Sequence, residues 1–268
     1  MSKLVTIYGG SGFVGRYIVR RMAKAGWRVR VAVRRPNEAI FVRPYGAVGQ
    51  VEPVFCNIRD DASVRAAMLG ADAVVNCVGI LAETGKSTFE AIQSDGAERI
   101  ARIAAAEGIS RMVHISAIGA DTESASEYAQ TKAMGEAAVL KHVPNAVILR
   151  PSIVFGPEDE FFNRFAGMTR LSPVVPVIGA DTLFQPVYVD DVAHAAELAV
   201  VGDAAAGVYE LGGPDVESFR ALMKRMLDVV HRRRLVLAVP MFAAKIMAFA
   251  FDILQSVTLG LVKNGVVT

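Results

Sequence analysis

The sequence has few cysteines, no excess of either charge and no long uncharged apolar run. Cys56 and Cys77 are the only cysteines, and both fall in apolar runs, so the spaced framework of a disulfide-stabilised secreted domain is absent. We therefore expect free thiols in a reducing compartment. The 29 Lys and Arg residues nearly balance the 27 Asp and Glu residues. The net charge therefore gives the protein no overall positive potential that would attract nucleic acid.

Apolar residues are abundant, at 53% of the chain with a mean hydropathy of +0.36. This excess predicts either a large core or an apolar surface that meets a partner or a lipid interface. Met1, Ser2 and Lys3 lead directly into the first expected strand, so we expect no signal or transit peptide. That start is typical of a bacterial cytoplasmic protein or a processed organellar one.

Short β-branched runs alternate with helical periodicity along the chain. Apolar residues recur three or four positions apart between most of these runs, as at Val14, Ile18 and Met22. This alternation predicts an α/β fold, a Rossmann-type doubly wound parallel sheet. It is regular up to residue 150, which predicts a dinucleotide-binding domain at 1–150 and a smaller C-terminal α/β region at 151–268. The expected strands are 4–8, 28–33, 51–56, 73–77, 111–116 and 146–149.

Three glycines, Gly9, Gly12 and Gly15, follow the first expected strand and open an amphipathic helix. The turn needs positive φ, a pyrophosphate needs backbone approach without a Cβ, and the helix must pack closely on the sheet. The first helical residues, Phe13 and Val14, would offer free N–H groups and partial positive charge. Because a second strand follows, the pattern predicts a bound dinucleotide rather than an unliganded turn.

The end of the second expected strand indicates which dinucleotide binds. NAD sites usually place an acidic residue there and NADP sites an arginine; this chain has Arg34 and Arg35, with no acidic residue between Arg16 and Asn37. We expect Arg34 to bind the 2′-phosphate of NADPH, helped by Arg16 and Arg35. The other basic residues of the helix are expected on a solvated face: Arg20, Arg21 and Lys24.

Further motifs follow in a fixed order: Asn57-Ile-Arg-Asp60, Asn76-Cys-Val-Gly79, Tyr128-Ala-Gln-Thr-Lys132, Leu149-Arg-Pro-Ser-Ile-Val-Phe-Gly156 and Val187-Tyr-Val-Asp-Asp191. Together with the glycine turn, they resemble the extended and atypical short-chain dehydrogenase/reductase superfamily over most of the chain. The resemblance implies that Asn57 and Ile58 border the adenine. It also implies a position beside the adenine ribose and pyrophosphate for Cys77, Val78 and Gly79, and an approach to the nicotinamide by Pro151 and Ile153.

In that superfamily a tyrosine and a lysine four residues apart do the chemistry, and Tyr128 and Lys132 match them. The resemblance implies that the ammonium holds the nicotinamide ribose and lowers the tyrosine pKa. Active members commonly carry two serines after the fifth strand. Here Ser116 matches the first and Ala117 replaces the second, which removes a donor worth a few kcal/mol unless Ser126 substitutes. We expect the pair to hold the cofactor, and turnover stays open.

The last sixty or so residues combine a basic cluster with apolar sequence. The cluster His231-Arg-Arg-Arg234 precedes the stretch 235–262, which Lys245 and Asp252 interrupt. No uncharged run therefore reaches the roughly eighteen residues that a spanning helix needs. The pattern is typical of an interfacial segment or of a helix docking onto a partner. The alternative is an ordinary helix packed inside its own domain.

The segments 8–17, 150–159, 161–168 and 185–189 also resemble the nucleotide-binding accessory subunits of respiratory complex I (NADH:ubiquinone oxidoreductase), in bacterial form. The resemblance implies a tightly bound NADPH with a structural role and other complex I subunits as partners. It further implies membrane contact through the C-terminal region, and a peripheral position on the cytoplasmic side of the inner membrane. Two alternatives remain, an active NADPH-dependent reductase or epimerase and an NADPH-sensing regulator. No metal site is assigned.

Overall fold

The computed structural model describes residues 2–239, which form two compact units. The first unit comprises residues 2–154 and Val187–Gly212. The second comprises Phe155–Pro186 and residues 213–239. This division differs from the single boundary expected at residue 150, because the chain leaves the first unit after Val154 and returns to it at Val187.

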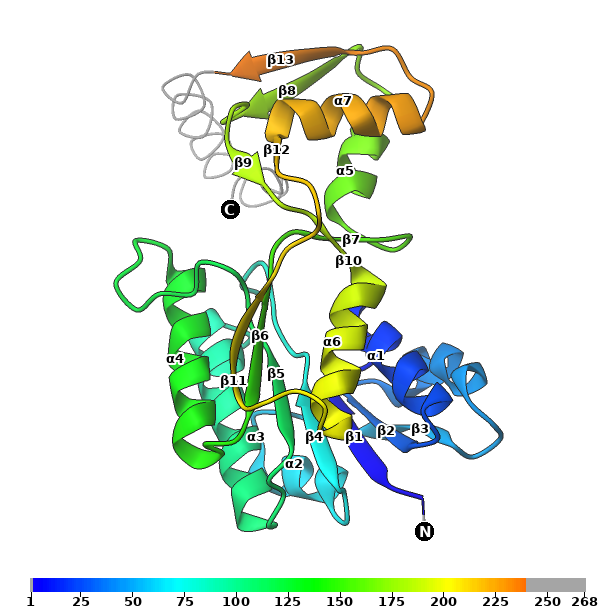
Figure 1. The fold of residues 1–268 in the computed structure, drawn as a ribbon, viewed down its shortest axis with the longest axis vertical. Helices are drawn as coiled ribbons and strands as arrows, with labels where there is room; N and C mark the ends of the chain where they lie inside the picture. The colour runs from blue at the N-terminus through cyan, green and yellow to red at the C-terminus, as the bar shows by residue number, and fades with distance from the viewer. Residues whose placement is uncertain (1, 240–268) are drawn as a thin grey trace. The chain divides into compact units, whose positions relative to one another are not determined.

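A seven-stranded parallel sheet forms the centre of the first unit, in the order β11-β6-β5-β4-β1-β2-β3 (Figure 1). The six expected strands are confirmed to within two residues at each end. The strand β11 adds an edge strand beside β6 that the sequence did not predict. The bounds are β1 Leu4–Tyr8, β2 Arg28–Val33, β3 Val51–Phe55, β4 Ala73–Asn76, β5 Met112–Ile115, β6 Val147–Pro151 and β11 Gly207–Leu211.

Helices cover both faces of this sheet, which confirms the doubly wound α/β architecture (Figure 1). One face packs against α1 (Phe13–Lys24) and α6 (Val189–Val201), with the 3-10 helix η1 (Pro36–Tyr45) beside them. Successive strand residues point to opposite faces, so Ile7 joins one core and Tyr8 the other. The elements of the other face are α2 (Asp61–Met68), the π-helical turn η2 (Glu90–Ser94), α3 (Asp95–Ala106) and α4 (Glu127–His142).

Arg21 helps to hold the segment after Val187 in the first unit, where α6 also packs into the buried core. Its Nη2 and Nε donate to the Asp190 carboxylate over 2.7 and 2.9 Å, and its Nη1 donates to Glu197 over 3.0 Å. Both acids lie on α6, so the pairing ties α6 to α1. The expectation that Arg21 is solvated is therefore wrong: its side chain is only 24% exposed. Arg20 and Lys24 are exposed, as expected.

The second unit has two parallel strands, β8 (Val174–Ile178) and β13 (Leu235–Val239), packed against α5 (Phe161–Met168) and α7 (Phe219–Val229). A short antiparallel pair joins β9 (Leu183–Phe184) to β12 (Glu217–Ser218). The two-residue strands β7 (Val154–Phe155) and β10 (Val187–Tyr188) occur where the chain leaves and re-enters the first unit. The second unit is thus a small α/β region, as the sequence predicted.

The basic cluster before β13 is partly structural. Arg232 donates to the carbonyl of Ala166 over 2.8 Å and to Thr169 Oγ1 over 2.7 Å, and Arg234 donates to the Thr169 carbonyl over 3.0 Å. These bonds satisfy groups at the C-terminal end of α5. The first five residues of the expected apolar stretch form β13 rather than a helix, and residues 240–262 lie outside the described chain. No helix within residues 2–239 is long and apolar enough to cross a membrane.

Candidate dinucleotide site

The glycine turn joins β1 to α1 with no room for side chains. Gly9 has a φ of +74°, and its carbonyl accepts from the Gly12 N–H over 2.9 Å. A Cβ on Gly15 would lie 2.8 Å from the Gly10 Cα and closer still to the Gly9 carbonyl oxygen. Gly12 caps α1, whose first turn contains no acidic residue. The free N–H groups of Phe13 and Val14 can therefore donate hydrogen bonds to an anion, with no nearby carboxylate on the helix to repel it.

The turn lies where the strand order reverses, between β1 and β4. A Cβ on Gly9 would meet the Cys77 carbonyl and the Val78 side chain at 3.2 Å, so these two loops are in close contact. In open α/β sheets this reversal forms the ligand crevice. Sequence reasoning missed Gly10, where a Cβ would lie 3.0 Å from Val31 and 3.1 Å from Val19. Gly10, and not only Gly15, allows close packing of α1 on the sheet.

Three arginines lie near the end of β2 and the start of α1. Arg35 pairs with Glu38 over 3.0 Å. The Arg16 guanidinium donates to the Gly12 and Ser11 carbonyls over 3.2 Å each and lies 4.9 Å from the centre of the Phe41 ring. Arg34 is exposed directly after β2, and within residues 2–239 it makes no hydrogen bond or ion pair. Of the three, Arg34 has the guanidinium that is most available to an anionic ligand.

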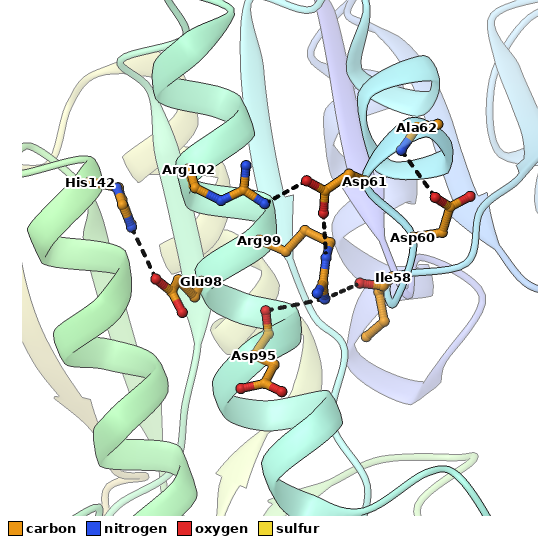
Figure 2. A network of polar contacts seen from close by, with 9 residues as sticks. All are labelled: Ile58, Asp60, Asp61, Ala62, Asp95, Glu98, Arg99, Arg102 and His142. Carbon is orange, nitrogen blue, oxygen red and sulfur yellow. Dashed lines mark hydrogen bonds and ion pairs between the residues drawn. The ribbon is translucent and has the colours of Figure 1, made fainter.

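The loop after β3, which contains Asn57 and Ile58, is held by α3 (Figure 2). Arg99 Nη1 donates to the Ile58 carbonyl over 3.0 Å. Arg99 and Arg102 each donate to the Asp61 carboxylate over 2.7 Å, and these bonds hold the pKa of Asp61 below its ordinary value. Ile58 is buried at 9% exposure. The network therefore fixes the loop that is expected to border the adenine.

Lys132 reaches from α4 to the ends of β4 and β5. Its side chain is buried, with Nζ donating to the Ile115 carbonyl over 3.3 Å. A Cβ on Gly79 would lie 3.2 Å from this Nζ. The same Nζ lies 5.9 Å from the centre of the Tyr128 ring. The structure thus brings Tyr128, Lys132, Gly79 and the end of β5 together.

Burial controls the protonation of this group of residues. It lowers the pKa of Lys132 to about 8, although electrostatic interactions with Glu136 and Cys77 act to raise it. It raises the pKa of Cys77 to about 12, so Cys77 is a neutral thiol at pH 7. It also raises the pKa of Tyr128, contrary to the expected lowering by lysine. The physical reason is that loss of water around the phenol outweighs any effect of an ammonium 5.9 Å from the ring centre.

A buried polar pair, Asn76 and His114, supports the loop after β4, and sequence reasoning assigned it no role. Asn76 Oδ1 accepts from the Val78 N–H over 3.0 Å, which directs its amide nitrogen to His114 Nδ1 at 3.1 Å. This network assigns the proton of the neutral ring to Nε2. Burial, and then Lys132, lower the pKa of His114 to about 3. The signal for this pair was a polar residue inside each of two apolar strands.

The remaining expected site residues follow β5 and β6. Ser116 is 4% exposed, and its Oγ has no hydrogen-bond partner within the described chain. Ala117 is half-buried, and Ser126 is exposed directly before α4. The Pro151 carbonyl accepts from the Ile118 N–H over 3.0 Å, and the Ile153 carbonyl accepts from the Val187 N–H over 2.9 Å. The ends of both strands therefore meet at the carboxyl edge of the sheet.

Lys132→Met should stabilise the protein at pH 7 by about 3 kcal/mol, because each unit of depressed pKa costs about 1.4 kcal/mol. The folded pKa is about 8 against an ordinary 10.5, so the unfolded chain binds more protons between these values. The free energy of unfolding should therefore rise with pH across that window in the parent protein and stay flatter in the variant. Urea unfolding at pH 7 to 10.5 measures the difference.

Lys141→Met is the matched control, because Lys141 is exposed on the same helix. It should change stability by less than about 0.5 kcal/mol at any pH. If Lys132→Met and Lys141→Met gave the same pH profile, the assigned cost of burying the Lys132 ammonium would be wrong. A stability gain on removing Lys132 would indicate that this lysine serves ligand binding and not folding.

The fold and the glycine crevice define a dinucleotide-binding protein of the Rossmann type, and the residues present fit such a ligand. A helix N-terminus, glycines where a Cβ would fill the crevice, and a buried ammonium converge at one sheet edge. The profile of the NAD dependent epimerase/dehydratase family matches residues 5–212. The chain belongs to this family.

Similar proteins include a mitochondrial NADH dehydrogenase [ubiquinone] 1 alpha subcomplex subunit 9 from Arabidopsis thaliana, 36% identical over 93% of this chain and 63% of that protein. A ceramide reductase from Caulobacter vibrioides is 33% identical over 71% of this chain and 58% of that protein. The chain spans less than two thirds of the length of these curated relatives. The structure of Thermus thermophilus UDP-glucose 4-epimerase in complex with NAD is similar in fold, with a TM-score of 0.70 at 22% identity over 88% of this chain and 86% of that one.

Proposed function

We propose that the chain is an accessory subunit of respiratory complex I that holds NADPH without consuming it. The 36% identity over 93% of the chain to an NADH dehydrogenase subunit is the observation that carries this proposal. It outweighs the likeness to sugar-nucleotide enzymes, which at 22% identity concerns the fold alone. The partners would be other subunits of complex I.

NADPH is favoured over NADH by the charge at the end of β2. An acidic residue there would bind the 2′-hydroxyl of NADH, but this position has the exposed and unpaired Arg34. Arg16, fixed against Phe41 and the turn carbonyls, adds a second cation. A planar guanidinium binds a phosphate through two parallel hydrogen bonds.

A holding role is favoured by the groups around Tyr128. Ala117 has no hydroxyl where active relatives are expected to place a serine, and Ser126 is exposed at the start of α4. Burial raises the pKa of Tyr128, which opposes proton transfer near neutral pH. Lys132 is buried at the sheet edge, where its ammonium suits a ribose hydroxyl. These features retain a ligand better than they transform one.

A native gel of gently solubilised membranes tests the proposal. The tagged chain should migrate with NADH dehydrogenase activity in a large assembly, and its NADPH should neither exchange quickly nor become oxidised when substrate is supplied to the complex. Migration only as a small species would contradict the subunit assignment. Release of the chain from the same membranes by high salt, before any detergent is added, is expected if its position on the membrane is peripheral.

Arg34→Glu should weaken NADPH binding about 10- to 100-fold and leave NADH binding nearly unchanged, because it replaces a charge-assisted contact to the 2′-phosphate with repulsion. Fluorescence titration of nucleotide-free protein measures both affinities. Arg28→Glu is the matched control, since Arg28 is the first residue of β2 and lies at the end of the strand away from Arg34. Equal losses in both variants, or none in Arg34→Glu, would contradict the phosphate assignment.

The second candidate is an active NADPH-dependent reductase. The convergence of Tyr128, Lys132 and Gly79 favours it, as does the 33% identity to a ceramide reductase. The nicotinamide cofactor, when bound, would supply a hydride, and Tyr128 would supply the proton. This candidate predicts oxidation of NADPH in the presence of a carbonyl compound, and loss of that oxidation in Tyr128→Phe. The structural role predicts no oxidation in either protein.

The membrane contact that the C-terminal region is expected to make belongs to the same proposal. Within the described chain, Leu235 and Leu237 of β13 are 63% and 50% exposed, and they follow the basic residues. Arg232 and Arg234 keep their charge, but some of their N–H donors already bind neutral groups at the end of α5, so fewer donors are left for a lipid headgroup. Leu235→Glu with Leu237→Glu should release the chain from membranes at lower salt than the parent.

A further inference from the structure

The second unit contains a cavity of about 410 Å³, apart from the dinucleotide site. Residues before and within α5 form one side and α7 forms the other. Its walls are mostly apolar, and they are formed by Phe155, Phe162, Ala166, Leu222, Met226 and Val230. A volume of this size lies in the range of the concave pockets that bind small molecules.

The walls of this cavity are held by contacts with one another and with the residues behind them. Phe155 and Phe162 pack edge to face at 6.2 Å, and Phe162 continues into a set of stacked phenylalanines through Phe161 at 5.0 Å. The buried carboxylate of Asp159 accepts from the Phe162 N–H and so anchors the start of α5. Rigid aromatic walls preserve the cavity, because collapse would break these contacts.

The charges at the cavity disfavour an anionic ligand. Arg225 is the one cation that lines it in the described chain, and it pairs with Glu217 over 2.7 Å and with Asp215 over 3.7 Å. Asp159 also lines the cavity, but its carboxylate is taken up by backbone N–H groups. A phosphate or carboxylate entering here would meet two acids and a cation that is already paired. Desolvating it without a free partner would be costly.

We propose that this cavity binds one uncharged single-chain apolar molecule, such as the tail of a fatty alcohol or an isoprenoid. At about 30 Å³ for each methylene-sized group, the cavity holds a chain of about ten to fourteen carbon atoms. The apolar walls bind the chain, and Asn163, whose amide nitrogen already donates to two backbone carbonyls, offers its Oδ1 to a neutral hydroxyl at one end. This inference is independent of the proposed role in complex I.

Fluorescence of the neutral probe N-phenyl-1-naphthylamine with the full chain tests the proposal. The probe should bind saturably at one site, and 1-dodecanol should displace it. Laurate, with the same chain and a carboxylate, should displace it at a concentration at least threefold higher, and UDP should not displace it. Asp215→Asn should lower the laurate concentration that displaces the probe about threefold, since it removes one partly exposed acid that repels the carboxylate. The concentration of 1-dodecanol that displaces the probe should stay unchanged.

Ala166→Trp fills the cavity and should weaken probe binding at least about tenfold. Val229→Trp does the same at the cavity rim, where Val229 is 73% exposed, and it decides the question if Ala166→Trp does not fold. Val216→Trp is the control, an exposed valine of the same unit that does not line the cavity. The proposal is overturned if the intact chain binds no probe, if UDP competes better than 1-dodecanol, or if the rim variant binds as the control does.

Discussion

Replacing Gly15 with alanine is expected to abolish dinucleotide retention and to lower the free energy of unfolding by about 1–3 kcal/mol. The added Cβ would lie 2.8 Å from the Gly10 Cα and closer to the Gly9 carbonyl oxygen. Both are backbone atoms, so relief requires movement of the turn that positions the helix N-terminus. Nucleotide extracted from the purified protein and urea unfolding measure the two effects.

Gly167→Ala is the matched control for this substitution. Gly167 lies within α5, and an added Cβ would meet nothing within 4 Å there. The same chemical change should raise stability by up to about 1 kcal/mol, because alanine is the better helix former. It should leave the nucleotide content unchanged. A Gly15→Ala protein that retained its nucleotide would show that this turn does not hold the pyrophosphate.

The fold of the first unit was predictable because parallel strands that are buried on both faces consist almost wholly of apolar residues. The division into units was not, since it involves contacts between residues far apart in the sequence, such as Arg21 and Asp190, which are 169 positions apart. Each of these residues looks like an ordinary surface charge in the sequence. Pairing of β11 with β6 likewise involves long-range contacts without a local pattern.

The glycines of the candidate site were predictable because each one meets a local steric requirement. Asn76 and His114 were missed, since a polar residue inside an apolar strand does not show which partner it will find. The pKa of Tyr128 was also beyond sequence reasoning. Spacing along a helix predicts that Lys132 is near, but only the structure shows that burial of the phenol is the larger effect.

Arg150→Met is expected to destabilise the protein by about 3–5 kcal/mol, because it strands a buried charge. The Glu136 side chain is 6% exposed, and it accepts from Arg150 Nε and Nη2 over 2.9 and 2.7 Å. The double variant Glu136→Met/Arg150→Met should recover most of the loss, since it removes both charges and leaves apolar side chains in their place. Urea unfolding of the parent, the two single variants and the double variant gives the coupling free energy between Glu136 and Arg150.

Arg102→Met is the control, because Arg102 also pairs with an acid over 2.7 Å, but at side-chain exposures of 44% and 56%. It should cost less than about 1 kcal/mol. Equal costs in Arg102→Met and Arg150→Met would refute the argument from burial. Because Glu136 raises the pKa of Lys132, the double variant should also shift the pH at which Lys132 loses its proton below 8. Recovery of stability together with this shift would show that the pair beneath the candidate site supports the fold and sets the charge of its lysine.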